Sequence, residues 1–250
     1  MLLHLGQRKQ NPNAWLRAQA HFAWAPTEEK WKISKGVDRV WHISYNTVTL
    51  ALEFGKFKHI GIFPEHESQW KMLATLCRAN KGVRVLNLFG YTGVASLVAA
   101  KEGAFVTHVD ASKQTIGTVK ENIALSHMDP QSIRLVCEDA LKYAKRLVQR
   151  AEQFDVIVMD PPAFGRGPKG EIWKIEEKLP ELVALIPKLL SKDARCVILN
   201  GYTAGYSARS FGEILRGAIS YGDVVYGDVG LEEKGSQRIL STGIYAMWSR

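Results

Sequence analysis

A chain of 250 residues exceeds the usual size of a single domain, but it still fits one large α/β domain with an appendage. Hydrophobic residues make up 46% of the sequence and charged residues 23%, which excludes a disordered or collagen-like chain. The formal net charge of +8 permits a polyanionic partner without requiring one.

The N-terminal stretch MLLHLGQRKQ carries its basic residues after a short apolar patch, which is the reverse of a secretory signal peptide. No uninterrupted apolar run approaches the ~18 residues that a membrane-spanning helix needs. The cysteines Cys77, Cys137 and Cys196 are odd in number and far apart, which is typical of reduced thiols. We therefore predict a cytoplasmic protein with no membrane segment, and the scattered histidines predict no metal site.

The first 60 residues differ from the rest, because the stretch RVWHISYNTVTLALEF alternates apolar and polar residues as strands do. We predict a small β-containing cap over residues 1–60 that recognises the substrate, and a main domain over residues 61–250. Basic residues of the cap interleave with aromatic ones, as in a groove that stacks bases and follows phosphates. The same aromatic residues could equally form the core of the cap. The residues concerned are Lys30, Lys32, Lys35, Arg39, Lys56 and Lys58, with Trp31, Trp41 and Phe57.

The segment PEHESQWKMLATLCRAN predicts a helix, with Trp70, Leu73, Ala74 and Cys77 on one apolar face. From residue 81 onward, short β-rich runs alternate with amphipathic helical segments. This alternation predicts right-handed βαβ crossovers and a parallel sheet with helices on both faces. Two β-like stretches near residues 223–229 and 239–248 predict a closing hairpin, with an antiparallel strand at one edge of the sheet. The expected parallel strands cover residues 83–89, 105–110, 133–137, 154–160 and 195–200.

Ligands of an open parallel sheet bind at the carboxyl ends of its strands, so the candidate site residues are sought there. The first strand runs into NLFGYTGVAS, in which Gly90 and Gly93 permit a tight turn that aims backbone amides at a ligand. The turn lacks the G-x-G-x-x-G pattern of a pyrophosphate-binding turn. A dinucleotide-dependent oxidoreductase is therefore disfavoured.

Acidic residues follow the next two strands. Asp110 comes about 20 residues after the glycine turn, where it could accept both hydroxyls of a ribose or simply cap the next helix. Asp139 precedes another predicted helix, and it could cap that helix, accept a hydrogen bond from an adenine amino group, or do both.

Together, the motifs VLNLFGYTGVAS, HVDAS, CEDA and VMDPPAFGRG resemble those of the class I S-adenosylmethionine-dependent methyltransferases. More narrowly, they are similar to those of the bacterial large-subunit ribosomal-RNA methyltransferase group. The resemblance covers residues 61–210 and implies a Rossmann-like α/β fold with a mostly parallel seven-stranded sheet and an antiparallel edge hairpin. It also implies S-adenosyl-L-methionine as the cofactor and ribosomal RNA as the partner.

The same resemblance implies a division of the cofactor among the strand ends. Residues 87–93 would cradle its methionine part, Asp110 would hold the ribose, and Asp139 with Ala140 would frame the adenine. A segment just before the glycine turn would also border the cofactor. The implied cofactor-binding residues are Phe63, Pro64, Glu65, Asn87, Phe89, Gly90, Tyr91, Thr92, Gly93, Asp110, Ser112, Asp139, Ala140 and Asp160.

Methyl transfer from a sulfonium is an in-line displacement that needs no metal, so the enzyme mainly aligns the reacting atoms. We predict that Asp160 accepts a hydrogen bond from the acceptor base, that Pro161 and Pro162 stiffen the turn, and that Phe164 stacks on the base. These four residues are the predicted catalytic residues. The glycine-rich loop that follows carries Arg166 and Lys169, which are expected to face phosphates.

The acceptor atom is predicted by the positions of the cysteines. Methylation at carbon 5 of a pyrimidine requires a thiolate that first adds to the ring. Cys196 lies on a predicted strand, about four residues before the position where related carbon-5 enzymes carry their cysteine. We therefore predict methylation at a base nitrogen, and Ala163 before Phe164 leaves open whether it is an exocyclic amine or a ring nitrogen. The alternatives are carbon-5 methylation, a protein or small-molecule acceptor, and a binding protein without turnover.

Overall fold

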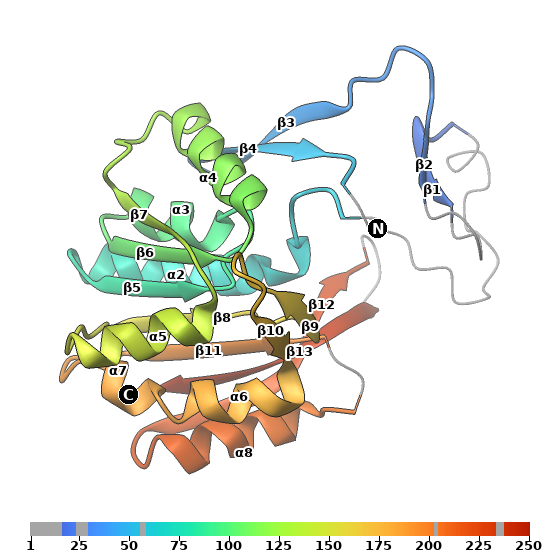
Figure 1. Ribbon diagram of the computed structural model, residues 1–250. Helices are drawn as coiled ribbons and strands as arrows, with labels where there is room; N and C mark the ends of the chain where they lie inside the picture. Colours follow the sequence, from blue (N-terminus) through green and yellow to red (C-terminus); the bar gives the residue numbers. More distant parts are fainter. Residues whose placement is uncertain (1–16, 24–29, 56–58, 203–204, 234–237) are drawn as a thin grey trace. The chain divides into compact units, whose positions relative to one another are not determined.

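The computed structural model describes residues 17–23, 30–55, 59–202, 205–233 and 238–250 of the chain (Figure 1). The chain divides into two compact units, one of residues 1–41 and 52–61 and the other of residues 42–51 and 62–250. The division runs through a hairpin of two strands, whose tip belongs to the larger unit. This larger unit contains every residue of the candidate site.

Two antiparallel strand pairs follow one another at the start of the described chain. Strand β1 (Ala20–Ala23) pairs with β2 (Lys30–Ile33), and β3 (Val40–Tyr45) pairs with β4 (Val48–Glu53). Asn46 makes the turn between β3 and β4 with a φ of 50°, a left-handed conformation that asparagine tolerates well.

Aromatic rings pack together in the smaller unit. The centroids of Trp31 and Trp41 lie 4.9 and 4.8 Å from that of Phe54, and Phe22 lies 5.3 Å from Trp31. Trp31 also donates from its indole nitrogen to the Gly55 carbonyl oxygen at 2.9 Å. Of the two predicted roles for these tryptophans, the structure therefore supports core packing. Residues Lys56, Phe57 and Lys58 lie outside the described residues.

A seven-stranded sheet forms the centre of the larger unit, and its strand order is β12-β13-β11-β8-β5-β6-β7. The five strands from β11 to β7 run parallel, whereas β13 is antiparallel to β11 and β12 is antiparallel to β13. The predicted α/β fold with a mostly parallel sheet and an edge hairpin is therefore confirmed. The strands are β5 (Arg84–Leu88), β6 (Phe105–Asp110), β7 (Ile133–Cys137), β8 (Val156–Met159), β11 (Cys196–Gly201), β12 (Asp223–Glu232) and β13 (Ile239–Ser249).

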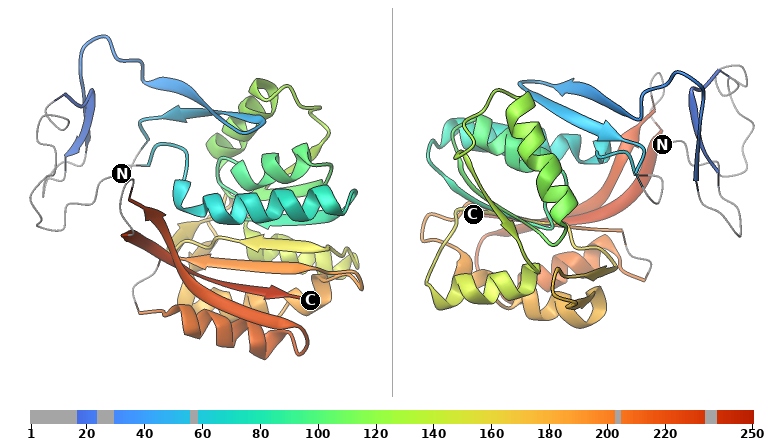
Figure 2. Two further views of the ribbon diagram at one scale, coloured as in Figure 1. Left: turned by 180° about the vertical axis from the view of Figure 1, so that it is seen from behind. Right: turned by 45° about the horizontal axis from the view of Figure 1, so that its top comes forward.

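Helices cover both faces of this sheet, as the two views in Figure 2 show. One face carries the 3-10 turn η2 (Pro64–His66) and the helices α2 (Glu67–Ala79), α3 (Val94–Lys101) and α4 (Lys113–Leu125). The other carries α5 (Ala140–Gln149), α6 (Ile175–Val183), α7 (Ile186–Leu189) and α8 (Ala208–Ala218).

The helices form where the apolar residues recur at helical spacing. In α2 the predicted face of Trp70, Leu73, Ala74 and Cys77 is buried, so Cys77 is a core residue. Each large apolar side chain buried in this way contributes about 1.5–3 kcal/mol, so the two helical layers hold the sheet between them and fix its strand ends.

The stretch after Asp160 differs from the prediction. We expected a glycine-rich loop, but β9 (Phe164–Arg166) and β10 (Ile172–Lys174) form a short antiparallel hairpin. The Gly167 amide donates to the Glu171 carbonyl oxygen at 2.8 Å and closes the hairpin, and Gly170 takes a φ of +87° in its turn. The strands are only three residues long, too short for a period-two pattern to be visible in the sequence.

Candidate active site

The glycine turn leaves the end of β5 and leads into α3. Its backbone is left-handed at Phe89, Tyr91 and Gly93, with φ of 59°, 50° and +89°. Two non-glycine residues in this region imply a conformation that the surrounding structure enforces. The turn is closed by the Gly93 amide, which donates to the Gly90 carbonyl oxygen at 3.0 Å.

A buried polar network lies beneath this turn. The Asn87 side-chain amide donates to the Ser96 hydroxyl at 2.9 Å, and that hydroxyl lies 2.9 Å from His108 Nδ1. Burial lowers the pKa of His108 to about 4, so its imidazole is neutral. A Cβ on Gly90 would lie 2.4 Å from His108 Cε1, so only glycine fits at this position. The sequence analysis assigned no role to Ser96 or His108, although both lie within the quoted motifs, because their contact joins two different motifs and is not visible along the chain.

Asn122 ties the same turn to the β3–β4 hairpin. This fully buried side chain of α4 donates to the Thr92 carbonyl oxygen at 2.9 Å and accepts from the Ala51 amide at 2.8 Å. One helix turn later, Ser126 both accepts from and donates to the backbone of Thr49. The position of β4 is therefore coupled to the position of the turn through Asn122.

Asp110 lies at the end of β6, directly beside the glycine turn. Its carboxylate accepts hydrogen bonds from the Tyr91 amide at 3.0 Å and from the Ser112 amide at 2.9 Å. Burial nevertheless raises the pKa of Asp110, against the opposing effect of these two bonds. The cap of α4 is Ser112, which accepts from the Thr115 amide, so the alternative that Asp110 caps this helix is wrong.

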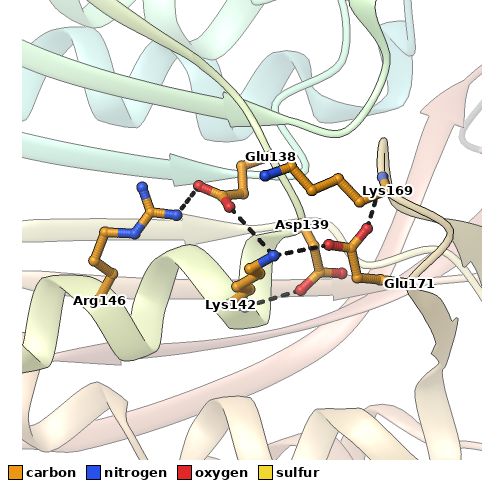
Figure 3. A network of polar contacts seen from close by, with 6 residues as sticks. All are labelled: Glu138, Asp139, Lys142, Arg146, Lys169 and Glu171. Atoms are coloured by element: carbon orange, nitrogen blue, oxygen red, sulfur yellow. Dashed lines mark hydrogen bonds and ion pairs between the residues drawn. The ribbon is translucent and has the colours of Figure 1, made fainter.

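Asp139 caps α5, because its carboxylate accepts from the Lys142 amide at 2.8 Å. Around it lies a network of charged side chains (Figure 3). The Lys142 ammonium bridges Glu138 at 3.9 Å and Glu171 at 3.1 Å, and Glu138 also pairs with Arg146. These contacts join the carboxyl end of β7 to the β9–β10 hairpin.

Asp160 follows β8, and its amide donates to the Leu88 carbonyl oxygen at 3.3 Å. Its Oδ1 atom is buried and has no hydrogen-bond partner among the described residues. Burial, and secondly the charge of Glu65, raise the pKa of Asp160 to about 7. A carboxyl group with an open buried oxygen can accept a hydrogen bond from a ligand or attract a cationic one.

Trp173 holds the proline turn that follows Asp160. From β10, its indole nitrogen donates to the Pro162 carbonyl oxygen at 2.7 Å, and its ring lies 4.7 Å from that of Phe89 in the glycine turn. Phe164 is 55% exposed. Sequence reasoning missed Trp173, since nothing in its neighbourhood along the chain points to this contact.

A cleft lies at these strand ends. It brings together part of the predicted site, namely Phe63, Asn87, Phe89, Gly90, Tyr91, Thr92 and Asp160. The other predicted residues lie outside its lining, namely Pro64, Glu65, Gly93, Asp110, Ser112, Asp139, Ala140, Pro161, Pro162 and Phe164. The sequence analysis assigned no ligand-binding role to its remaining lining residues, which are His66, Gln69, Trp70, Val94, Ala95, Val158, Ile198 and Asn200.

Within the ranges that the structure describes, no three His, Cys, Asp or Glu side chains gather as they would around a metal ion. A search of the same ranges finds no helix with the length and apolar character needed to span a membrane.

Comparison with known proteins gives consistent matches. The family described as "Conserved hypothetical protein 95" matches residues 66–191. A solved structure of an S-adenosylmethionine-dependent methyltransferase from Agrobacterium tumefaciens is 37% identical, with a TM-score of 0.91 over 96% of this chain and 79% of that one. A methyltransferase structure from Streptococcus mutans, at 19% identity, shares the fold with a TM-score of 0.69 over 88% and 58% of the two chains.

A curated relative from Shewanella sp. (strain MR-4) is named "Ribosomal RNA large subunit methyltransferase K/L". It is 34% identical over 143 residues, which make up 56% of this chain and 20% of the relative. The chain therefore spans about a fifth of the length of the curated relatives that it matches.

The fold and the cleft at the strand ends identify the chain as a class I S-adenosylmethionine-dependent methyltransferase, as the motifs predicted. Within that class, the chain belongs to the family described as "Conserved hypothetical protein 95".

The cleft fits the cofactor of this class. S-adenosyl-L-methionine carries a positively charged sulfonium and a positively charged amino group. Asp160, whose Oδ1 has no partner among the described residues, lines this cleft, and its ionised form would attract such a ligand.

Proposed function

We propose that this protein transfers the methyl group of S-adenosyl-L-methionine to a nitrogen of a base in RNA, with ribosomal RNA as the substrate and the cytoplasm as its location. The observation that carries the proposal is Asp160. Its carboxyl group lies directly after strand β8 and lines the cleft. Its Oδ1 atom is buried and has no hydrogen-bond partner among the described residues, so it can accept a hydrogen bond from a ligand.

In this proposal the cofactor extends along neighbouring strand ends. Residues 87–93 contact its methionine part, with residues 63–65 at the border. Asp110 with Ser112 binds the ribose hydroxyls, which is compatible with its present bonds because each carboxylate oxygen has a second lone pair. Asp139 and Ala140 border the adenine.

The bound cofactor supplies an activated methyl group on a cationic sulfur. The contribution of the chain is to present the acceptor nitrogen in line with that methyl group. Ionised Asp160 accepts a hydrogen bond from the acceptor base and so directs a nitrogen lone pair into the cleft. Trp173 keeps the turn of Pro161 and Pro162 in place by its bond to the Pro162 carbonyl oxygen. Phe164 lies exposed beside this turn and stacks on the base.

A nitrogen acceptor is favoured over carbon 5 by the cysteines. All three lie in the described part of the chain, and none lines the cleft. Burial raises the pKa of Cys196 on β11 to about 12, and that of Cys77 to about 12, so both stay protonated thiols. A protonated, buried thiol is a poor nucleophile for attack on a pyrimidine ring.

An RNA acceptor is supported by the names of the curated relatives and by the net charge of +8. In the smaller unit, the side chains of Lys32, Lys35 and Arg39 belong to exposed residues. Since Trp31 and Trp41 pack in the core of that unit, we assign substrate recognition there to the basic residues and their contacts with phosphates.

The proposal is tested by incubating the protein with ribosomal RNA and S-adenosyl-L-methionine that carries an isotope-labelled methyl group. Mass spectrometry of the digested nucleosides should find the label on a base nitrogen. Label on carbon 5 of a pyrimidine would reject the acceptor atom. Label on ribosomal protein alone would reject RNA as the substrate.

A further inference from the structure

Two hydrogen-bonded pairs join the start of α2 to the end of β11. Gln69 and Asn200 exchange two amide hydrogen bonds, of 2.7 and 3.0 Å. The Tyr202 hydroxyl lies 2.5 Å from His66 Nε2. Asn200 is 1% exposed and His66 is 7% exposed, so both pairs reach into the interior.

The contact between Tyr202 and His66 joins two neutral groups. Burial lowers the pKa of His66 to about 4, so the imidazole carries no charge near pH 7. Burial, together with the charges of Asp160 and Glu65, raises the pKa of Tyr202 above its usual value, so the phenol keeps its proton. This bond therefore fixes the direction of the Tyr202 ring at neutral pH.

Tyr202 lies beside the catalytic corner. Met159 of β8 pairs with Leu199 of β11, so Asp160 and Asn200 follow this pair side by side. Tyr202 comes two residues later, and its pKa responds to the charge of Asp160. Its position is thus set by the same parallel strand pair that sets Asp160.

The ring of Tyr202 is only partly covered. Its centroid lies 6.0 Å from that of Phe63 and 5.9 Å from that of His66. A Cβ on Gly243 of β13 would lie 2.9 Å from the ring atoms Cδ1 and Cε1, so this glycine lets the strand pack against the ring. The residue is nevertheless 41% exposed, although its hydroxyl is anchored inside. An anchored tyrosine with exposed ring surface is suited to stacking on a flat aromatic ligand.

We propose that Tyr202 binds the acceptor base by stacking, and that His66 positions the ring through its hydroxyl. This inference rests on the proposed transfer to an RNA base. It adds an aromatic contact from the residue that follows β11 to the contact from Phe164, which lies on the segment after Asp160. Tyr202 has no role in binding the cofactor in this proposal, whereas His66 also lines the cleft.

The test compares five proteins: the natural one, Tyr202→Leu, Tyr202→Phe, His66→Gln and Tyr226→Leu. Tyr226 on β12 is a matched control, since it is 39% exposed and packs against Gly212 of α8. Methyl transfer to ribosomal RNA is measured for kcat and KM, and S-adenosylhomocysteine binding is measured for Kd. Thermal unfolding of each variant identifies any loss of folding.

For Tyr202→Leu we expect KM for RNA to rise about tenfold to a hundredfold, the range that the loss of one stacked base corresponds to. Its Kd for S-adenosylhomocysteine should stay within about threefold of the natural value. Tyr202→Phe keeps the ring and loses the anchor, so its KM should rise by less, and His66→Gln should reproduce that smaller rise. Tyr226→Leu should leave KM unchanged.

An unchanged KM in a folded Tyr202→Leu variant would overturn the stacking role and leave the proposed function intact. An equal rise in the Tyr226→Leu variant would overturn it as well. If the natural protein transfers no methyl group to RNA, the proposed function itself fails, and the role of Tyr202 fails with it.

Discussion

The glycine turn and the corner at Asp160 lie at the ends of adjacent parallel strands, yet they differ in how their polar groups are satisfied. Around the turn, Asn87, Ser96, Asp110 and Asn122 are each hydrogen-bonded within the protein, although Nε2 of the buried His108 beneath them has no partner among the described residues. In the corner, Asp160 Oδ1 is buried with no partner among the described residues.

This difference separates the hydrogen bonds that the chain makes by itself from the one that a ligand completes. An unsatisfied buried polar atom costs about 1–3 kcal/mol, so it persists only where something offsets that cost. The backbone of the turn is held by hydrogen bonds to Asp110 and Asn122, so it is preorganised before binding. In the corner, the acceptor base is expected to donate the missing hydrogen bond to Asp160 Oδ1.

The largest expected effect comes from Asp160→Asn. This change keeps the size of the side chain but replaces one accepting oxygen by a donating amide group. Methyl transfer should fall about 10²- to 10⁴-fold, because the acceptor nitrogen is no longer directed toward the methyl group. Calorimetric titration should find the Kd for S-adenosylhomocysteine within about threefold of that of the natural protein.

Asp110→Asn should have the opposite effect, because it should weaken cofactor binding before it lowers the rate of methyl transfer. Equal effects of both changes on Kd would remove the distinction between the two regions.

Asn122→Ala tests whether the turn depends on its tie to β4. Two buried backbone groups, the Ala51 amide and the Thr92 carbonyl, would each lose a hydrogen bond, so the free energy of unfolding should fall by about 2–4 kcal/mol. Cofactor affinity should fall as well, because Thr92 lies in the turn. Ser126→Ala is the matched control, since it loses contacts only with Thr49. A variant of Asn122 that is destabilised but binds the cofactor normally would contradict the coupling.

Gly90→Ala adds one methyl group between the turn and the network beneath it. The new Cβ would lie 2.4 Å from His108 Cε1, so we expect a loss of about 1–3 kcal/mol in unfolding free energy. Gly117→Ala in α4 is the control, because no atom lies within 4 Å of its added Cβ, and it should stabilise the protein by about 0.5–1 kcal/mol. Adding His108→Ala should restore part of the stability that Gly90→Ala removes. No such recovery would mean that His108 does not limit the turn.

The pH dependence of methyl transfer should follow the ionisation of Asp160. Because the pKa of Asp160 is raised to about 7, the ionised form that accepts the hydrogen bond is lost as pH falls below 7. The rate of transfer at saturating substrates should therefore fall about tenfold per pH unit below this value and level off above it. His66 cannot produce this inflection, since its pKa is about 4.

The same raised pKa has the opposite consequence for stability. Between about pH 4 and pH 7 the folded protein keeps a proton on Asp160 that the unfolded chain releases, so the contribution of this group to stability falls as pH rises through that window. In denaturant titrations Asp160→Asn should lack this dependence. If the variant follows the natural protein at every pH, the carboxyl group is not buried in the way that the corner requires.

The sequence predicted the sheet, its edge hairpin and the strand-end motifs, because each depends on residues that are close along the chain. Gly90, Asp110 and Asp160 are recognisable since each follows a short β-rich run. The spacing of Trp70, Leu73 and Cys77 predicted their burial for the same reason.

The missed residues depend on partners that are remote in the sequence. Tyr202 meets His66 across 136 positions, and Gln69 meets Asn200 across 131. In the sequence, Asn122 looks like an ordinary polar residue of an amphipathic helix. Its role is visible only in the structure, where the backbone of β4 lies against it. Side chains of this kind become visible only when the sheet brings their strands together.

The most direct test of the central claim is a crystal structure of the protein with S-adenosylhomocysteine. We expect the ligand in the cleft, with its ribose hydroxyls on Asp110 and its sulfur beside Asp160, whose Oδ1 still lacks a hydrogen-bond partner. A structure in which Asp160 points away from the sulfur, or in which the ligand itself satisfies Oδ1 and closes the corner, would contradict the account.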